Sequence, residues 1–113
     1  NGPYSPQDGS CKTCCGGVTM NSSDYKTISK NSHWYNVAHA SAVVKPGARM
    51  IETSGSKFQA AFEYQMFLNP DNTIGVLMLN GLSSSQQVIF RNDEFTVKYN
   101  VPAGSIVSLL WQE

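Results

Sequence analysis

The residues of this chain that could carry acid–base chemistry are eight carboxylates and two histidines. Catalysis by carboxylates requires two of them to converge on the bond that is cleaved. The carboxylates here are scattered, because Glu52, Glu63 and Glu94 fall on the polar side or at the ends of expected strands, and Asp71 and Asp93 fall in expected turns. We therefore predict solvated structural roles for them and no catalytic pair.

The two histidines do not suggest a metal site. His33 and His39 are six residues apart in an expected helix, so they point to different faces, and neither pairs with a cysteine at metal-ligand spacing. We expect His39 to bond a backbone group or a neighbouring side chain rather than to act as a base. No serine stands in a Gly-x-Ser-x-Gly turn either. The sequence therefore predicts no metal, no cofactor and no serine nucleophile.

Three cysteines lie within five positions. Cys11 and Cys14 have the Cys-x-x-Cys spacing, but the strand-to-helix context of a redox motif is absent, so we predict a structural disulfide between them. Cys15 is then left over, either free and buried or paired with a cysteine elsewhere. Asn21 begins an Asn-Ser-Ser acceptor sequence for glycosylation. Both features favour an extracellular, secreted protein.

Charge and hydropathy limit the partners. Eight basic and eight acidic residues cancel, and only 14% of the 113 residues are charged, so no basic surface is available to bind phosphates or anionic lipid. The longest apolar runs are far shorter than the roughly 20 residues of a membrane span. We therefore expect neither nucleic acid nor membrane as a partner.

A change of period divides the chain at Lys45-Pro46-Gly47. Residues 1–30 are rich in loop-forming residues, with one short extended piece expected at 18–20. Asn31 or Ser32 can cap a helix that begins near His33 and ends before Pro46. Helical spacing places five residues on one face of it: Trp34, Val37, Ala38, Ser41 and Val44.

The residues from 48 to 111 contain about five strand-like runs. One strand alternates from Phe58 to Leu68, the turn at Asn69 to Asn72 joins it to a nearly continuous apolar run from Thr73 to Asn80, and three further runs follow at 87–91, 95–101 and 106–111. The apolar run at 73–80 is typical of a central strand that is covered on both faces. The whole segment predicts an antiparallel sandwich or barrel.

Several motifs resemble glycoside hydrolase family 30. The main match is the segment from His33 to Ser41 that runs into Val44-Lys45-Pro46-Gly47-Ala48-Arg49. Further matches follow in order along the chain: the Asn-Gly-Pro opening, the cysteine loop at 9–17, Asn69-Pro70-Asp71 before a strand ending in Leu79-Asn80, and Val101-Pro102-Ala103-Gly104-Ser105 leading to Trp111.

This resemblance implies a mainly β fold, an antiparallel β-sandwich side domain preceded by the last loop and helix of a (β/α)8 barrel. Residues 1–45 would be the C-terminal end of the catalytic barrel, and residues 46–113 the β-sandwich domain. The chain would be the C-terminal portion of a secreted retaining hydrolase of β-linked glycans, of the β-1,6-glucanase or β-1,6-galactanase type. Its partner would be the N-terminal barrel portion, where the catalytic glutamates would lie.

The resemblance also places the loop from Asn1 to Gly17 along the substrate cleft, because loops at the carboxyl ends of barrel strands build the active site. Tyr4 would then offer its ring to a sugar of the β-linked glycan. Trp34, on the apolar helix face, is expected to be a core residue. A piece of a larger enzyme should also show an apolar helix face and at least one sheet edge that need covering.

Two alternatives remain. A free-standing carbohydrate-binding β-sandwich module without catalysis could use Tyr4, Tyr25, Tyr64 or Tyr99 as a platform, but it requires exposed aromatics in a line. Tyr64 and Tyr99 alternate in step with Phe and Val, which predicts burial. The other alternative is a purely structural or interaction domain.

Overall fold

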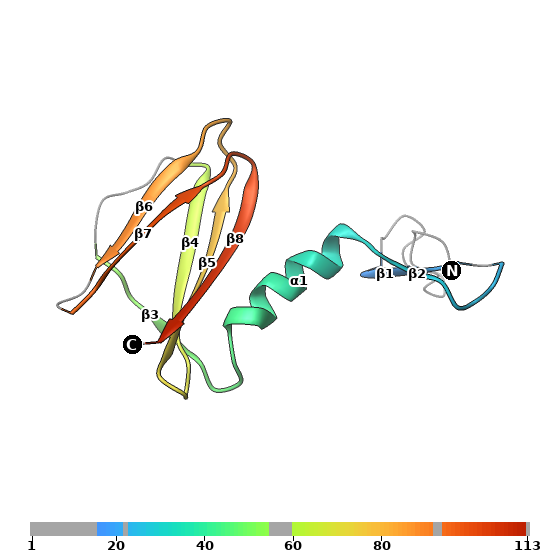
Figure 1. The fold of residues 1–113 in the computed structure, drawn as a ribbon, viewed down its shortest axis with the longest axis horizontal. Helices are drawn as coiled ribbons and strands as arrows, with labels where there is room; N and C mark the ends of the chain where they lie inside the picture. Colours follow the sequence, from blue (N-terminus) through green and yellow to red (C-terminus); the bar gives the residue numbers. More distant parts are fainter. Residues whose placement is uncertain (1–15, 22, 55–59, 92–93, 113) are drawn as a thin grey trace. The chain divides into compact units, whose positions relative to one another are not determined.

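A computed structural model describes residues 16–21, 23–54, 60–91 and 94–112. Figure 1 shows the elements in chain order: β1 (Val18–Met20), β2 (Ile28–Lys30), α1 (Ser32–Val43), β3 (Arg49–Ile51), β4 (Phe62–Leu68), β5 (Thr73–Asn80), β6 (Gln86–Arg91), β7 (Thr96–Val101) and β8 (Ser105–Gln112). The chain forms two compact units, residues 1–38 and 39–113, and α1 contributes to both.

The second unit is a β-sandwich. One layer is a four-stranded sheet in the order β3-β4-β5-β8, the other is the β6-β7 pair, and every pairing is antiparallel. From β5 the chain crosses to the other layer, forms β6 and β7, and returns as β8 beside β5 (Figure 1). The mainly β, antiparallel fold is therefore confirmed, and of the sandwich and the barrel it is the sandwich that forms.

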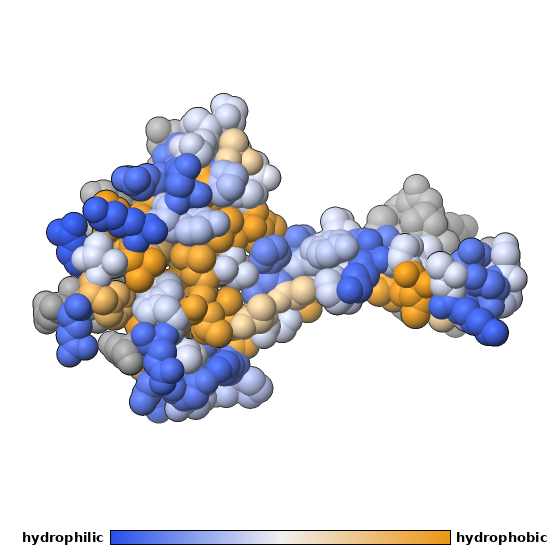
Figure 2. All heavy atoms as spheres, viewed as in Figure 1, coloured by the Kyte–Doolittle hydropathy of each residue, from blue (hydrophilic) through white to orange (hydrophobic). Residues whose placement is uncertain are grey.

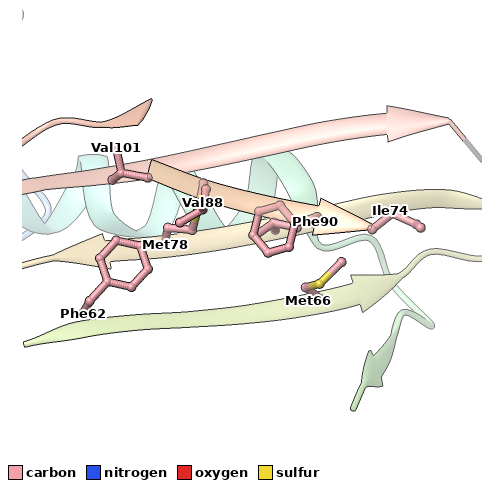
Figure 3. Packing of buried hydrophobic residues seen from close by; sticks show 8 residues of the cluster. Phe62, Met66, Ile74, Met78, Val88, Phe90 and Val101 are labelled. Carbon is pink, nitrogen blue, oxygen red and sulfur yellow. The ribbon is translucent and has the colours of Figure 1, made fainter. Parts of the chain in front are cut away.

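The hydrophobic core lies between the two layers. Alternate residues of each strand point inward, as the period of two requires. Figure 3 shows Val88 and Phe90 of β6 directed toward residues of β4 and β5. Half-buried Trp111 closes one end, with ring centroids 6.1 Å from Phe90 and 6.0 Å from Phe95. The buried cluster consists of Phe62, Met66, Ile74, Val76, Met78, Val88, Phe90 and Val101.

Strand β5 is the central strand, as its apolar run predicts. It pairs with β4 on one side and with β8 on the other. Ile74, Val76 and Met78 face the core, and on the opposite face Gly75 lies against the end of α1. A Cβ atom at Gly75 would lie 2.1 Å from the carbonyl oxygen of Val43, so only glycine permits this approach of helix to strand.

Two expectations for the sandwich need correction. The strand expected from Phe58 begins at Phe62, because its partner β5 ends at Asn80, opposite Phe62. One backbone bond, from Gly81 N to Ala61 O at 2.8 Å, follows this last pair. Phe58 itself lies outside the described residues. Tyr99, expected to be buried, is 37% exposed, because β7 is bordered by another strand on only one side.

The first unit contains a hairpin that the sequence did not reveal. The extended piece at 18–20 was expected, but it pairs with β2, and a three-residue strand is too short to show an alternating pattern. The side-chain amide of Asn31 donates to Gly16 O at 2.8 Å and to Thr19 Oγ1 at 2.9 Å, which ties the hairpin to the start of α1. Asn31 thus precedes the helix as expected, but its side chain bonds the hairpin.

No described residue between 16 and 38 is buried. Trp34, expected in a core, is 36% exposed, since the short strands beside it bury little surface. Figure 2 shows apolar side chains at the surface of both units. In this unit the exposed ones are Val18, Met20, Tyr25, Ile28, Trp34, Tyr35 and Val37.

Candidate functional site

The described carboxylates do not form a catalytic pair. Hydrogen bonds from Thr27, and from the backbone of Lys26, lower the pKa of Asp24. Hydrogen bonds from Lys45 and then Thr73 lower the pKa of Asp71 to about 2. Neither shift involves a second carboxylate, and a general acid would require a raised pKa. Both groups are therefore solvated structural anions, as expected.

The histidines likewise have structural surroundings. His39 Nδ1 lies 3.0 Å from Ser108 Oγ, so it joins α1 to β8 through a neighbouring side chain, as predicted. His33 is exposed. The described part of the chain holds no cluster of three or more metal-ligating side chains. Within the same residues, no helix has the length and apolar character that crossing a bilayer would take.

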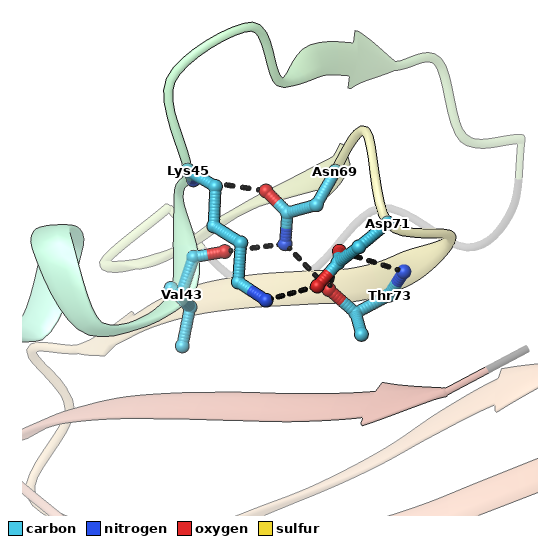
Figure 4. A network of polar contacts seen from close by, with 5 residues as sticks. All are labelled: Val43, Lys45, Asn69, Asp71 and Thr73. Atoms are coloured by element: carbon cyan, nitrogen blue, oxygen red, sulfur yellow. Dashed lines mark hydrogen bonds and ion pairs between the residues drawn. The ribbon is translucent and has the colours of Figure 1, made fainter.

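The main polar network of the sandwich surrounds Asn69, a buried residue in the turn between β4 and β5 (Figure 4). Its Nδ2 donates to Val43 O and to Thr73 Oγ1, both at 3.0 Å, and its Oδ1 accepts from Lys45 N at 2.9 Å. One side chain therefore satisfies the last carbonyl of α1 and the second amide beyond the helix. Outside it, Lys45 forms an ion pair with Asp71.

A second buried amide, Asn80, fixes the opposite end of the sandwich. Its Nδ2 donates to Ser84 O at 3.0 Å and to Pro102 O at 2.9 Å, with Val101 O at 3.2 Å, and its Oδ1 accepts from Leu82 N at 3.0 Å. Asn80 thus holds the loop after β5 against the turn before β8. The Asn69-Pro70-Asp71 and Leu79-Asn80 motifs are therefore structural in this chain.

The outer face of the four-stranded sheet carries exposed apolar side chains beside polar ones such as Glu63 and Gln65. Met50 of β3 is 69% exposed, and Leu79 of β5 and Leu110 of β8 are also exposed. By register, half-buried Phe67 and Leu77 lie on the same face. The end of α1 covers the part of this face around Gly75 and Ser108. Apolar side chains are thus exposed on a sheet face, whereas the sequence predicted a helix face and a sheet edge as the surfaces that need covering.

Most of the predicted site residues lie outside the part of the chain that the structure describes. Tyr4 and the three cysteines, Cys11, Cys14 and Cys15, lie outside the described residues, so the substrate contact and the disulfide stay predictions. Asn21 is exposed in the hairpin loop, and its Oδ1 accepts a hydrogen bond from Ser23 N at 2.8 Å. Its glycosylation also stays a prediction.

The aromatic row required by a sugar-binding module is not present on the sandwich as described. Tyr64 is half-buried, its ring lies 6.0 Å from that of Phe90, and its hydroxyl lies 2.7 Å from Thr53 Oγ1. Tyr99 is exposed on the other layer, and Tyr25 belongs to the other unit. These rings do not form one line on one sheet face.

Comparison with known proteins agrees with the fold. Residues 47–109, more than half of the chain, match the glycosyl hydrolase family 30 beta sandwich domain. The solved structure of the endo-beta1,6-glucanase BT3312 matches all of this chain with 37% sequence identity and a TM-score of 0.87. SrfJ from Salmonella typhimurium matches 90% of the chain with 20% identity and a TM-score of 0.78, a likeness of fold.

The chain spans 25% of the length of the glucanase chain and 22% of the length of SrfJ. No curated protein matches it in sequence. The family match covers β3 to β8 up to Leu109, whereas the main motif of the resemblance, from His33 to Arg49, lies mostly before it. The chain belongs to glycoside hydrolase family 30.

Proposed function

We propose that this chain is the C-terminal portion of a secreted, retaining glycoside hydrolase that cleaves β-1,6-linked glycans. The observation that carries the proposal is the whole-chain match, at 37% identity, to an endo-β-1,6-glucanase of which it spans only a quarter. The rest of such an enzyme would be the N-terminal barrel portion. Residues 1–45 would complete that barrel, and residues 46–113 would form the sandwich beside it.

The surfaces of the chain support a missing partner within the same enzyme. Residues 16–38 bury none of their described side chains, and an isolated two-stranded hairpin is marginally stable at best in water. The outer sheet face exposes Met50, Leu79 and Leu110. Exposed apolar side chains that gather on one face of a soluble protein often mark an interaction surface. A barrel packed on both surfaces would remove these side chains from water.

The chemistry would take place on the barrel. In a retaining hydrolase one carboxylate attacks the anomeric carbon while a second protonates the leaving oxygen, the two lying about 5 to 5.5 Å apart. Both glutamates would lie outside this chain, in agreement with the solvated state of Asp24 and Asp71. The contribution of this chain would be structural, together with a loop that carries Tyr4 along the substrate cleft.

Secretion, the disulfide and the glycan belong to the same proposal. Cys11 and Cys14 would form a disulfide in an oxidising compartment, and Asn21 would carry a glycan there if the host has the transferase. Mass spectrometry after alkylation without reduction tests the disulfide, and the mass of the peptide that contains Asn21 tests the glycan. Two alkylated thiols fewer than after reduction would support the disulfide, and three alkylated cysteines without reduction would refute it.

The function is tested with the complete enzyme on linear β-1,6-glucan and β-1,6-galactan, with the product followed by proton NMR. We expect cleavage of one of them, with the β-anomer released first because double displacement retains configuration. The 113-residue chain alone should be inactive. Failure on both polymers would refute the substrate, and release of the α-anomer first would refute the retaining mechanism.

A further inference from the structure

Tyr25, at the tip of the β1–β2 hairpin, combines an unusual backbone with an exposed ring. Its φ of 53° lies in the left-handed region, which is unfavourable for a bulky side chain. Its side chain is 70% exposed. Glycine or asparagine would fit this backbone with less strain, so the presence of tyrosine calls for a reason other than folding.

The surrounding turn holds this conformation in place. The Tyr25 N–H donates to Asn21 O at 2.9 Å, and the Asn21 N–H donates to Thr27 O at 2.9 Å. The Asp24 carboxylate accepts from the N–H groups of Lys26 at 2.9 Å and Thr27 at 3.0 Å. The loop therefore presents one aromatic ring to solvent from a backbone that is already ordered.

The neighbouring aromatic residues differ from Tyr25 because their rings contact other side chains. The ammonium group of Lys30 lies 3.8 Å from the centre of the Trp34 ring, and Tyr35 meets the same indole at 5.2 Å, edge to face. Among the residues that the structure describes, the Tyr25 ring has no ring contact and its hydroxyl no hydrogen bond. With 70% of the side chain exposed, the ring is accessible to a ligand.

We propose that Tyr25 binds the glycan by stacking its ring on the apolar face of a pyranose. The proposal rests on the proposed function, in which the segment between the last barrel strand and α1 belongs to the side of the barrel that carries the active site. Aromatic faces attract the C–H groups of a sugar ring, and an ordered platform loses little entropy on binding. Tyr25 is a binding residue, separate from the reacting atoms.

The test compares the complete enzyme with its Tyr25→Gly variant on the polymer that the wild type cleaves. Glycine relieves the left-handed strain, so Tm should stay equal or rise. Losing the platform should raise KM about 3- to 10-fold with kcat unchanged, as expected for a contact of the size of an aromatic pair. Both results together support the proposal.

Ile28→Ala is the matched control, because Ile28 is an exposed apolar residue of the same hairpin. In the complete enzyme the barrel would cover this side chain, so Ile28→Ala should lower Tm and leave KM unchanged. If Tyr25→Gly lowers Tm and leaves KM unchanged, as the control does, Tyr25 packs against the rest of the enzyme and the proposal is wrong. If Tyr25→Gly changes neither KM nor Tm, the proposal is also wrong. A wild-type enzyme inactive on every β-linked polymer would overturn the proposed function and this proposal with it.

Discussion

Residues 39–112 and residues 16–38 place their apolar side chains in different surroundings. In the first region, strands of six to eight residues from two layers enclose a core in which Val76, Met78 and Val101 have no exposed surface. In the second, two strands of three residues lead into a helix, and every large apolar side chain that is described reaches solvent. The two regions have similar residue types and very different burial.

The difference shows which part of the chain carries its own stability. Burial of apolar surface is the main favourable term in folding, so residues 39–112 can hold their fold within the chain. Residues 16–38 are ordered by local hydrogen bonds, such as those of Asn31, which contribute little while water competes for them. We infer that the second region depends on the remainder of the enzyme. Matched substitutions in the two regions test this inference.

The largest contrast is expected for two methionines. Met78 is fully buried and Met20 is 38% exposed. Met78→Ala should destabilise the chain by about 4 kcal/mol through lost transfer energy and a cavity, whereas Met20→Ala should cost less than about 0.5 kcal/mol. Urea denaturation of the 113-residue chain measures both. Equal losses would mean that the two regions share one core.

Two glycines give the next contrast. Gly75→Ala sets a Cβ against the Val43 carbonyl and should cost about 3 kcal/mol by forcing α1 away from β5. At Gly17 the nearest atom, Trp34 N, would lie 3.9 Å away, an ordinary contact, so Gly17→Ala should change the unfolding free energy by less than about 0.5 kcal/mol. Thermal unfolding followed by circular dichroism compares them, and a neutral Gly75→Ala would contradict the close approach.

The third contrast concerns two asparagines with several hydrogen bonds each. Asn69→Ala leaves the Val43 carbonyl and the Lys45 amide without their partner in a buried site, and should cost about 2 kcal/mol. Asn31→Ala should cost less than about 1 kcal/mol, because water can replace a half-buried side chain. Chemical denaturation measures both losses. A larger loss of unfolding free energy at Asn31 than at Asn69 would contradict the inference that residues 39–112 carry the stability of the chain.

The smallest effects are expected from two exposed aspartates. Lys45 and Thr73 lower the pKa of Asp71 from 3.8 to about 2, so its contribution is present above pH 4 and is lost as the pH falls toward 2. Asp71→Asn should therefore flatten the acid dependence of sandwich unfolding in that window. Asp24→Asn should leave sandwich unfolding unchanged. Urea midpoints at several pH values test this, and an unaltered acid slope in Asp71→Asn would exclude the Lys45 pair as its cause.

Much of the sandwich could be predicted from local patterns. Alternation, and for β5 a nearly continuous apolar run, predicted the strands from Phe62 onward, and turn residues such as Pro70 and Gly104 marked the connections. The roles of Gly75 and Asn69 could not be read in the same way, because they depend on which strand and which helix end become neighbours in space. The order β3-β4-β5-β8 supplies that information, and no local pattern does.

Residues 16–38 show the opposite case. A three-residue strand such as β2 has no period to detect, and the left-handed backbone of Tyr25 depends on hydrogen bonds that only the folded turn provides. The apolar face that includes Trp34 and Val37 was recognised, but both side chains are exposed in the structure. The family motifs identified the family, which no candidate catalytic residue did. Under the proposed function, the chemistry would lie in a part of the enzyme outside this chain.

The most direct test of this account is hydrogen–deuterium exchange, measured on the 113-residue chain and on the complete enzyme under the same conditions. We predict that amides of β4, β5 and β8 are protected in both, whereas amides of β1 and β2 are protected only in the complete enzyme. Equal protection of β1 and β2 in the isolated chain would contradict the dependence of residues 16–38 on the rest of a family 30 hydrolase.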